Sequence, residues 1–195
     1  MISTRLPLRT TVLAATLTVS AILLSACSGS GETKNDDPSS GANGMTVVPV
    51  GHRPPIGNLK GETIDGKELN VADYRGRIVV INVWGSWCSP CRAEAPDFAK
   101  VAKSTKRDGV AFVGINTRDN SRLARAFTKD FNIDYPSLYD PYGEITLKGF
   151  PKGTINPQAI PSTVVLDRQG RIAARALEQL TGDDLRKMIL LVKKK

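Results

Sequence analysis

The sequence predicts an α/β fold over residues 45–195, built from buried β-strands that alternate with α-helices. Two observations carry this prediction. Residues 77–84 and 110–116 are nearly continuous runs of branched apolar residues, as expected for strands that are covered on both faces of a sheet. A segment with apolar residues at helical spacing follows each run. Strands and helices in alternation indicate a central sheet flanked by helices.

The first elements expected in this region are a hairpin, a strand and a helix. Residues 61–69 contain the pair Asp65-Gly66 between two short runs, and this dipeptide favours a tight hairpin turn. The first central strand covers residues 77–84. A helix is expected over residues 89–104, because its apolar residues fall on one face.

The remaining elements continue the alternation. Residues 110–116 form the second central strand, and a helix over residues 119–131 follows, with Asp119 or Asn120 available as its N-cap. Two further strands and a terminal amphipathic helix are expected at residues 162–167, 172–177 and 183–192. No internal repeat is present, so these elements predict one domain.

Composition limits the class of protein further. The chain has 195 residues, a formal net charge of +8 and 41% hydrophobic residues, which suits one globular domain with additional terminal sequence. This composition excludes collagen-like, coiled-coil and fully disordered proteins. No second closely spaced pair of cysteine or histidine residues accompanies Cys88 and Cys91, so no zinc site is expected. No other cofactor is expected.

The N-terminal residues 1–26 have the pattern of a signal peptide. A basic start precedes an uncharged, largely apolar run that is shorter than the about 20 residues that a membrane span needs. Leu24-Ser25-Ala26-Cys27 resembles the lipobox of bacterial lipoproteins, which implies a diacylglyceryl thioether on Cys27. A plain secretory signal and an uncleaved membrane anchor are the alternatives.

Residues 27–44 are expected to form the lipidated cysteine and a flexible tether, because they are small and polar and lack large apolar side chains. Residues 45–195 then form the folded domain and retain the whole net charge of +8. Nucleic acid is not an expected partner, since the chain is predicted to be exported and shows no platform of basic and aromatic residues. The predicted location is the extracytoplasmic face of the cell membrane.

The reactive chemistry is expected where the strand at residues 77–84 meets its helix. Trp87-Cys88-Ser89-Pro90-Cys91 places two thiols three residues apart at that junction. The free N–H groups and the dipole of a helix N-terminus stabilise a thiolate, so Cys88 is predicted to be the exposed nucleophile. Cys91, one turn into the helix, is close enough to close a disulfide onto Cys88. A purely structural disulfide and half of a zinc knuckle are the alternatives.

Residues 82–96 resemble the active-site segment of TlpA/ResA-like thiol-disulfide oxidoreductases. They read Asn-Val-Trp-Gly-Ser-Trp-Cys-Ser-Pro-Cys-Arg-Ala-Glu-Ala-Pro, and the similarity extends to residues 69–77 and 160–163. The resemblance implies a thioredoxin fold, with a central mixed sheet flanked by helices and an N-terminal β-hairpin extension. It also implies a central insertion that includes residues 136–160.

The resemblance implies roles for individual residues of the pair and its surroundings. Cys88 would attack a substrate disulfide and Cys91 would resolve the intermediate, which leaves a Cys88–Cys91 disulfide. Pro161 would follow a cis peptide bond, and the backbone of Ile160 would face the disulfide and pair with a bound polypeptide. Trp87 would shield the disulfide at the substrate side, with an ordinary core position as the alternative.

Glu94 matches the acidic residue that helps this family to manage the proton of the resolving thiol. Asn82 stands where thioredoxin carries a buried acid, and this difference shifts any proton relay onto Glu94. The alternative for Glu94 is a solvated acid in the first turns of a helix.

The implied function is that of an extracytoplasmic, membrane-tethered enzyme that reduces protein disulfides. Its substrates would be exported proteins such as apocytochrome c, and cytochrome c maturation is the specific role that the family suggests. An integral membrane thiol carrier would supply the electrons. The protein itself would be a monomer. A general disulfide oxidase or isomerase, a peroxiredoxin-like peroxidase and a non-enzymatic lipoprotein binding module are the alternatives.

Overall fold

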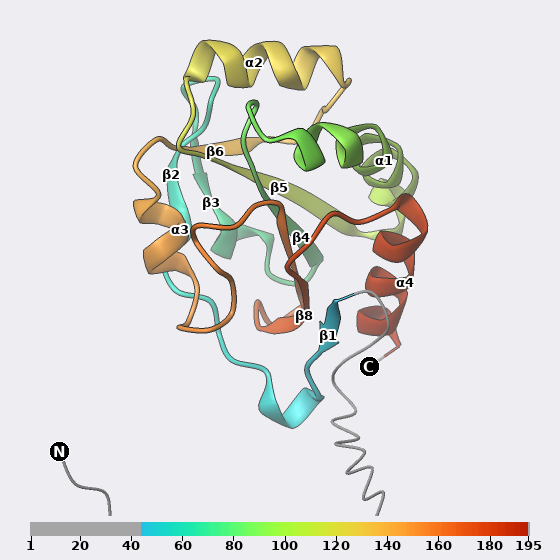
Figure 1. Ribbon diagram of the computed structural model, residues 1–195. Helices are drawn as coiled ribbons and strands as arrows, with labels where there is room; N and C mark the ends of the chain where they lie inside the picture. The colour runs from blue at the N-terminus through green and yellow to red at the C-terminus, as the bar shows by residue number, and fades with distance from the viewer. Residues whose placement is uncertain (1–43, 195) are drawn as a thin grey trace, which may run out of the picture. The chain divides into compact units, whose positions relative to one another are not determined.

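A six-stranded mixed sheet forms the centre of the computed structural model, which describes residues 44–194 (Figure 1). The strand order is β1-β8-β7-β4-β5-β6. Strands β4, β5 and β6 are parallel to one another. Strand β7 is antiparallel to β4, β8 is antiparallel to β7, and β1 is antiparallel to β8. These strands are β1 (Met45–Val47), β4 (Ile78–Trp84), β5 (Val110–Thr117), β6 (Ser137–Asp140), β7 (Ser162–Leu166) and β8 (Ile172–Ala176).

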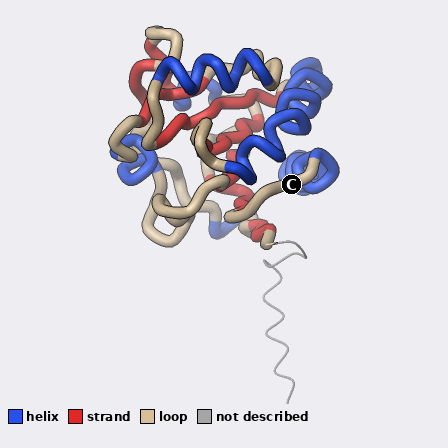
Figure 2. The backbone as a smooth tube through the Cα atoms, turned by 45° about the horizontal axis from the view of Figure 1, so that its top comes forward, coloured by secondary structure: helices blue, strands red, loops and turns tan. Residues whose placement is uncertain are grey.

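Helices surround this sheet, and Figure 2 shows the strands at the centre with helices around them. In Figure 1, α1 and α4 lie on one side, and α3 lies on the other side together with the small β2–β3 sheet. The α-helices are α1 (Ser89–Thr105), α2 (Ser121–Asp130), α3 (Glu144–Gly149) and α4 (Gly182–Lys193). Short 3-10 helices cover Val50–His52, Val71–Tyr74 and Lys106–Asp108. The predicted mixed sheet flanked by helices is therefore confirmed.

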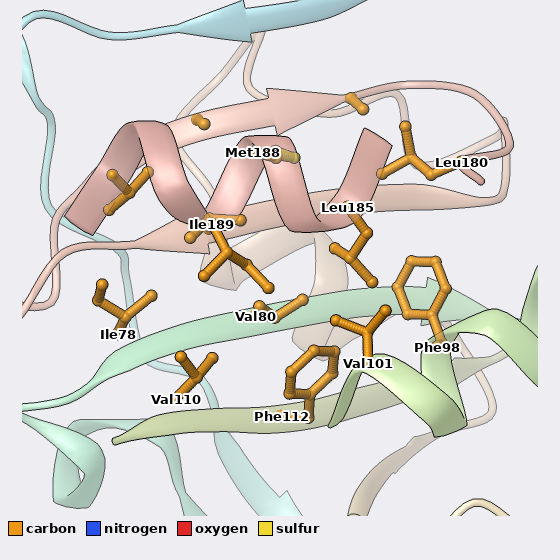
Figure 3. Close-up of a cluster of buried hydrophobic side chains, with 14 of the residues drawn as sticks. Ile78, Val80, Phe98, Val101, Val110, Phe112, Leu180, Leu185, Met188 and Ile189 are labelled. Atoms are coloured by element: carbon orange, nitrogen blue, oxygen red, sulfur yellow. The ribbon is translucent and has the colours of Figure 1, made fainter. Parts of the chain in front are cut away.

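Strand β4 is buried along its whole length, because apolar layers cover both of its faces. Side chains alternate between the faces of a strand. Ile78 and Val80 join the cluster under α1 and α4, which Figure 3 shows, whereas Val79 and Ile81 join the cluster on the opposite face. The alternation places Asn82, two residues after Val80, on the face that α1 covers.

The predicted hairpin is present as a two-stranded antiparallel sheet of β2 (Lys60–Glu62) and β3 (Glu68–Asn70). Gly66 in its turn has a φ of +78°, a conformation that glycine adopts without steric cost. The hairpin is connected to the central sheet, because the N–H of Ile64 donates to the carbonyl oxygen of Ser137 in β6 over 2.9 Å.

Residues 136–160, expected as an insertion, contribute to the central sheet as well as to its surroundings. They include β6, which pairs in parallel with β5 at the edge of the sheet, and α3. Neither β6 nor the three-residue β1 was among the predicted strands. Short strands carry too little sequence pattern to be recognised, and their pairing depends on tertiary contacts.

The predicted signal peptide (1–26), the lipidation site Cys27 and residues 27–43 of the tether lie outside the described residues. Within residues 44–194, no helix is long and apolar enough to cross a membrane.

Candidate active site

The two cysteines lie where β4 ends and α1 begins, and they form a disulfide with a Cα–Cα distance of 5.2 Å. Cys88 is the N-cap of α1, and its Sγ accepts a hydrogen bond from the backbone N–H of Cys91 over 3.2 Å. A sulfur at this position accepts a hydrogen bond from a backbone N–H that has no acceptor within the helix. The same interaction stabilises a Cys88 thiolate once the disulfide is reduced.

A cis peptide bond joins Ile160 to Pro161, as the resemblance implies. The carbonyl oxygen of Ile160 lies 3.7 Å from Cys88 Sγ. Topology explains this approach, because β7 begins at Ser162 and pairs antiparallel with the end of β4 through Ser162 and Val83. Cys88 is only 4% exposed in the disulfide form, so the prediction of an exposed nucleophile is wrong for this state. Its sulfur lies against Ile160 instead.

Glu94 is buried beneath the cysteine pair and is 2% exposed, which excludes the solvated alternative. Both carboxylate oxygens accept hydrogen bonds: Oε1 from Asn82 Nδ2 over 2.9 Å and Oε2 from the backbone N–H of Leu180 over 3.1 Å. Burial raises the pKa of Glu94 from its ordinary value of 4.5 to about 7, although both hydrogen bonds act in the opposite direction. Glu94 can therefore hold or release a proton at neutral pH.

Glu94 and Cys91 occupy neighbouring positions on α1, because residues three apart on a helix lie on one face. Cys91 is 1% exposed, so the resolving sulfur and the carboxyl group share an environment with little water. A proton that leaves the Cys91 thiol therefore has a nearby acceptor, because the pKa of Glu94 lies near neutral pH.

Trp87 is 55% exposed, so a core position is excluded. Its indole Nε1 donates a hydrogen bond to the carbonyl oxygen of Arg118 over 3.0 Å, and the guanidinium carbon of Arg118 lies 5.6 Å from the centroid of the Trp87 ring. The buried tryptophan of this region is Trp84, which stacks on Phe127 of α2 with ring centroids 4.4 Å apart.

Asp119 holds the segment before the cysteines in place, a role that the sequence analysis missed. Its carboxylate accepts hydrogen bonds from the backbone N–H of Ser86 over 2.6 Å, from Ser86 Oγ over 2.9 Å and from Asn116 Nδ2 over 2.9 Å. Asn120, the second of the two predicted caps, is the N-cap of α2. Asp119 follows the carboxyl end of β5, which is the edge of the sheet where β4 also ends, and this position was the available signal.

The fold and the cysteine pair can be compared with known proteins. Residues 49–189 match the family model described as Redoxin. The chain belongs to the Redoxin family. Its relatives include the thiol-disulfide oxidoreductase ResA of Geobacillus thermodenitrificans (strain NG80-2), at 26% identity over 148 residues that cover 76% of this chain and 80% of the relative.

Two solved structures resemble this Redoxin-family protein. A DsbF homologue from Corynebacterium diphtheriae has 38% sequence identity and a TM-score of 0.68, with 77% of this chain and 94% of the other covered. A secreted thiol-disulfide isomerase from Corynebacterium glutamicum has 30% identity and a TM-score of 0.68, with 80% and 95% covered. The thioredoxin-like fold is thereby confirmed. With a Cys-x-x-Cys pair at disulfide distance, this Redoxin-family protein is a thiol-disulfide oxidoreductase.

Proposed function

We propose that this enzyme reduces disulfides in exported proteins while Cys27 anchors it by a lipid to the extracytoplasmic face of the membrane. The observation that carries the proposal is the Cys88–Cys91 pair at the N-terminus of α1, with the buried Glu94 one helical turn from Cys91. The lipobox resemblance at Cys27 supports the anchor, and the secreted relative from Corynebacterium glutamicum supports an extracytoplasmic location.

The first step uses Cys88 at the N-terminus of α1. The Cys88 thiolate attacks one sulfur of the client disulfide, a new S–S bond forms to that sulfur, and the second client sulfur leaves as a thiolate that takes up a proton. The backbone of Ile160, next to the cis Pro161, offers its carbonyl oxygen to the client main chain beside the attacked sulfur. Trp87 borders the same surface and completes the client site.

The second step uses Cys91 and Glu94. Glu94 accepts the proton of the Cys91 thiol, and the resulting thiolate attacks Cys88 Sγ. The bond between Cys88 and the client breaks, and the client sulfur leaves as a thiolate that takes up a proton and becomes the second client thiol. Two electrons have then moved from the cysteine pair to the client, and the Cys88–Cys91 disulfide of the structure is the oxidised product.

The cycle requires an external dithiol that returns two electrons and two protons to the cysteine pair. An integral membrane thiol carrier fits this requirement for a protein held at the membrane surface. Apocytochrome c, whose cysteine pair must be reduced before haem attachment, is the client that we propose. The Ser89-Pro90 dipeptide contains no histidine that would further stabilise the Cys88 thiolate, and this composition favours a reductant over a strong oxidant.

A trapping experiment tests this proposal. Cys91→Ala in the full-length protein leaves Cys88 without its resolving partner, so mixed disulfides with clients are expected to accumulate and to be released by a reducing agent. The matched control is the double variant Cys88→Ala, Cys91→Ala, which captures nothing. Capture of apocytochrome c supports the specific role, whereas absence of any captured protein contradicts the reductase. A reduction potential near that of a strong oxidase, roughly −120 mV, would contradict the direction of electron flow.

A further inference from the structure

We propose that Arg118 makes the enzyme selective for clients that carry a carboxylate side chain next to the attacked cysteine. This inference rests on the proposed reduction of protein disulfides, and it adds the chemistry by which a client is chosen. Arg118 was not among the residues that the sequence singled out.

Arg118 lies beside the nucleophile through its contact with Trp87. It directly follows β5, whose end pairs with the end of β4 through Asn116 and Trp84. Its carbonyl oxygen accepts from the Trp87 indole, and its guanidinium group lies against the ring of this residue, which immediately precedes Cys88. The positive charge of Arg118 is therefore fixed at the edge of the cysteine site.

The same contact places Arg118 at the surface proposed for the client. A Cβ atom at Gly85 would lie 2.8 Å from Trp87 Nε1 and 3.3 Å from Ile160 Cδ1, so the Trp87 ring and Ile160 both lie over Gly85. Gln158, two residues before Ile160, accepts a hydrogen bond from Arg118 Nη1 over 3.2 Å. Arg118 therefore borders the segment that would pair with the client main chain.

The guanidinium group has binding capacity that the described residues do not use. Nε and Nη2 are buried and have no acceptor within residues 44–194, and Arg118 takes part in no ion pair there. The neighbouring carboxylate of Asp119 is directed to Ser86 and Asn116 instead. A buried N–H without an acceptor is unfavourable, so a ligand that supplies acceptors would relieve that cost.

A carboxylate is the ligand that fits these N–H groups. The planar guanidinium fork matches two carboxylate oxygens, and hydrogen bonds between charged partners are stronger than those to a neutral amide. Among the described residues, Gln158 is the only hydrogen-bond acceptor for the Arg118 side chain, and its amide is neutral. A client carboxylate can therefore displace Gln158 and bind Nη1.

The backbone at Arg118 also departs from the ordinary pattern. Its φ is +52°, in the left-handed region where asparagine and glycine are far more common than a long side chain. Such outliers cluster at functional sites, where the surrounding structure holds them. Here the hydrogen bond from the N–H of Arg118 to the carbonyl oxygen of Asp140, over 3.0 Å, and the Trp87 contact hold the residue.

The test compares two peptide disulfides in a single turnover of the reduced full-length enzyme. Both peptides carry one cysteine capped by neutral 2-mercaptoethanol, and they differ only in Glu or Gln next to that cysteine. We expect the second-order rate constant for the Glu peptide to exceed that for the Gln peptide by about three- to five-fold at low salt, the size of an exposed ion pair. The ratio should approach one at high salt, because salt screens exposed charges.

Variants of Arg118 then locate the preference. Arg118→Gln should bring the ratio to about one, Arg118→Lys should retain part of it because the charge remains without the fork, and Arg118→Glu should reverse it. The matched control is Arg107→Gln, which removes the same charge at the far end of α1, about 25 Å along the helix, and should keep the wild-type ratio. The ratio is insensitive to a uniform loss of activity, so a partly unfolded variant does not imitate the effect.

Two results would overturn the inference. A Glu-to-Gln rate ratio of one for the wild type, or a ratio that Arg118→Gln leaves unchanged, would show that Arg118 does not distinguish clients by their charge. Reduction of neither peptide would overturn the proposed reductase function itself, and with it this inference.

Discussion

The two sides of the cysteine pair are built in opposite ways. Behind Cys91, Glu94 is 2% exposed and both of its oxygens accept hydrogen bonds. Beside Cys88, Trp87 is 55% exposed, and Arg118 carries N–H groups that have no hydrogen-bond acceptor among the described residues. The two cysteines belong to the same helical turn, so the difference arises from what the rest of the chain packs against each of them.

This contrast separates two tasks that a thiol-disulfide oxidoreductase must perform. Proton transfer benefits from burial, because removal from water brings the pKa of a carboxyl group to the pH at which the enzyme works. Recognition of a polypeptide benefits from an accessible surface that carries aromatic and arginine side chains. Under the proposed function, the buried side would govern the rate of resolution, and the exposed side would govern which client is attacked.

The largest expected effect is on the buried side and concerns stability. Because the pKa of Glu94 is raised to about 7 in the folded state, its contribution to stability is complete below the unfolded value of 4.5 and is lost as the pH rises through 7. Relative to Glu94→Gln, the free energy of unfolding of the oxidised wild type should fall by about 3 kcal/mol between pH 4.5 and 8. Urea unfolding at a series of pH values measures this difference.

The Glu94→Gln variant can keep the local hydrogen bonds, because the Asn82 amide can turn and present its oxygen to the new amide nitrogen. Thr163 Oγ1, which lies 3.4 Å from Asn82 Nδ2, can donate to the same oxygen. Glu68→Gln in the exposed hairpin is the matched control and should follow the wild-type pH profile. A parallel profile for Glu94→Gln would contradict a raised pKa for Glu94.

The second effect concerns catalysis on the same side. Glu94→Gln should slow the resolution of a preformed mixed disulfide at Cys88 by roughly 100-fold near pH 7, the lower range for loss of a general base. The wild-type rate should also show an inflection near pH 7 that the variant lacks. Release of a chromophoric thiol from Cys88 measures both quantities. Equal rates and equal pH profiles would remove Glu94 from the proton path.

Much of the buried side could be predicted from the sequence, because its signals are local. The spacing of Cys88 and Cys91 at a strand–helix junction predicts a redox pair, and the family resemblance implies the role of Glu94. The apolar runs on either side of the pair predict the strands of the sheet. The second hydrogen-bond donor to Glu94 could not be predicted in this way. Leu180 lies 86 residues away along the chain, and its N–H reaches the carboxylate only because α4 packs against α1.

On the exposed side, the resemblance implied Trp87 and Ile160, but the roles of Arg118 and Asp119 were missed because their contacts join segments that are distant in the sequence. Arg118 and Gln158 are 40 residues apart, and Asp119 and Ser86 are 33 residues apart. Residues 118 and 119 lie in the turn after a strand, where arginine and aspartate are ordinary residues with no pattern of their own. Their role depends on the parallel pairing of β4 and β5, which brings the ends of both strands to one edge of the sheet.

The smallest of these effects tests whether the exposed side is independent of the buried one. Asp119→Ala leaves the backbone N–H of Ser86 and the amide of buried Asn116 without their acceptor, and should lower the free energy of unfolding by about 2 kcal/mol. Because Glu94 lies on the other side of the pair, this loss should be the same at pH 4.5 and at pH 8. Asp130→Ala, which removes an exposed carboxylate at the end of α2, is the control and should change stability by less than about 0.5 kcal/mol. A loss that varies with pH across this range would mean that the two sides are coupled through the cysteine pair, and the division of tasks between them would then be wrong.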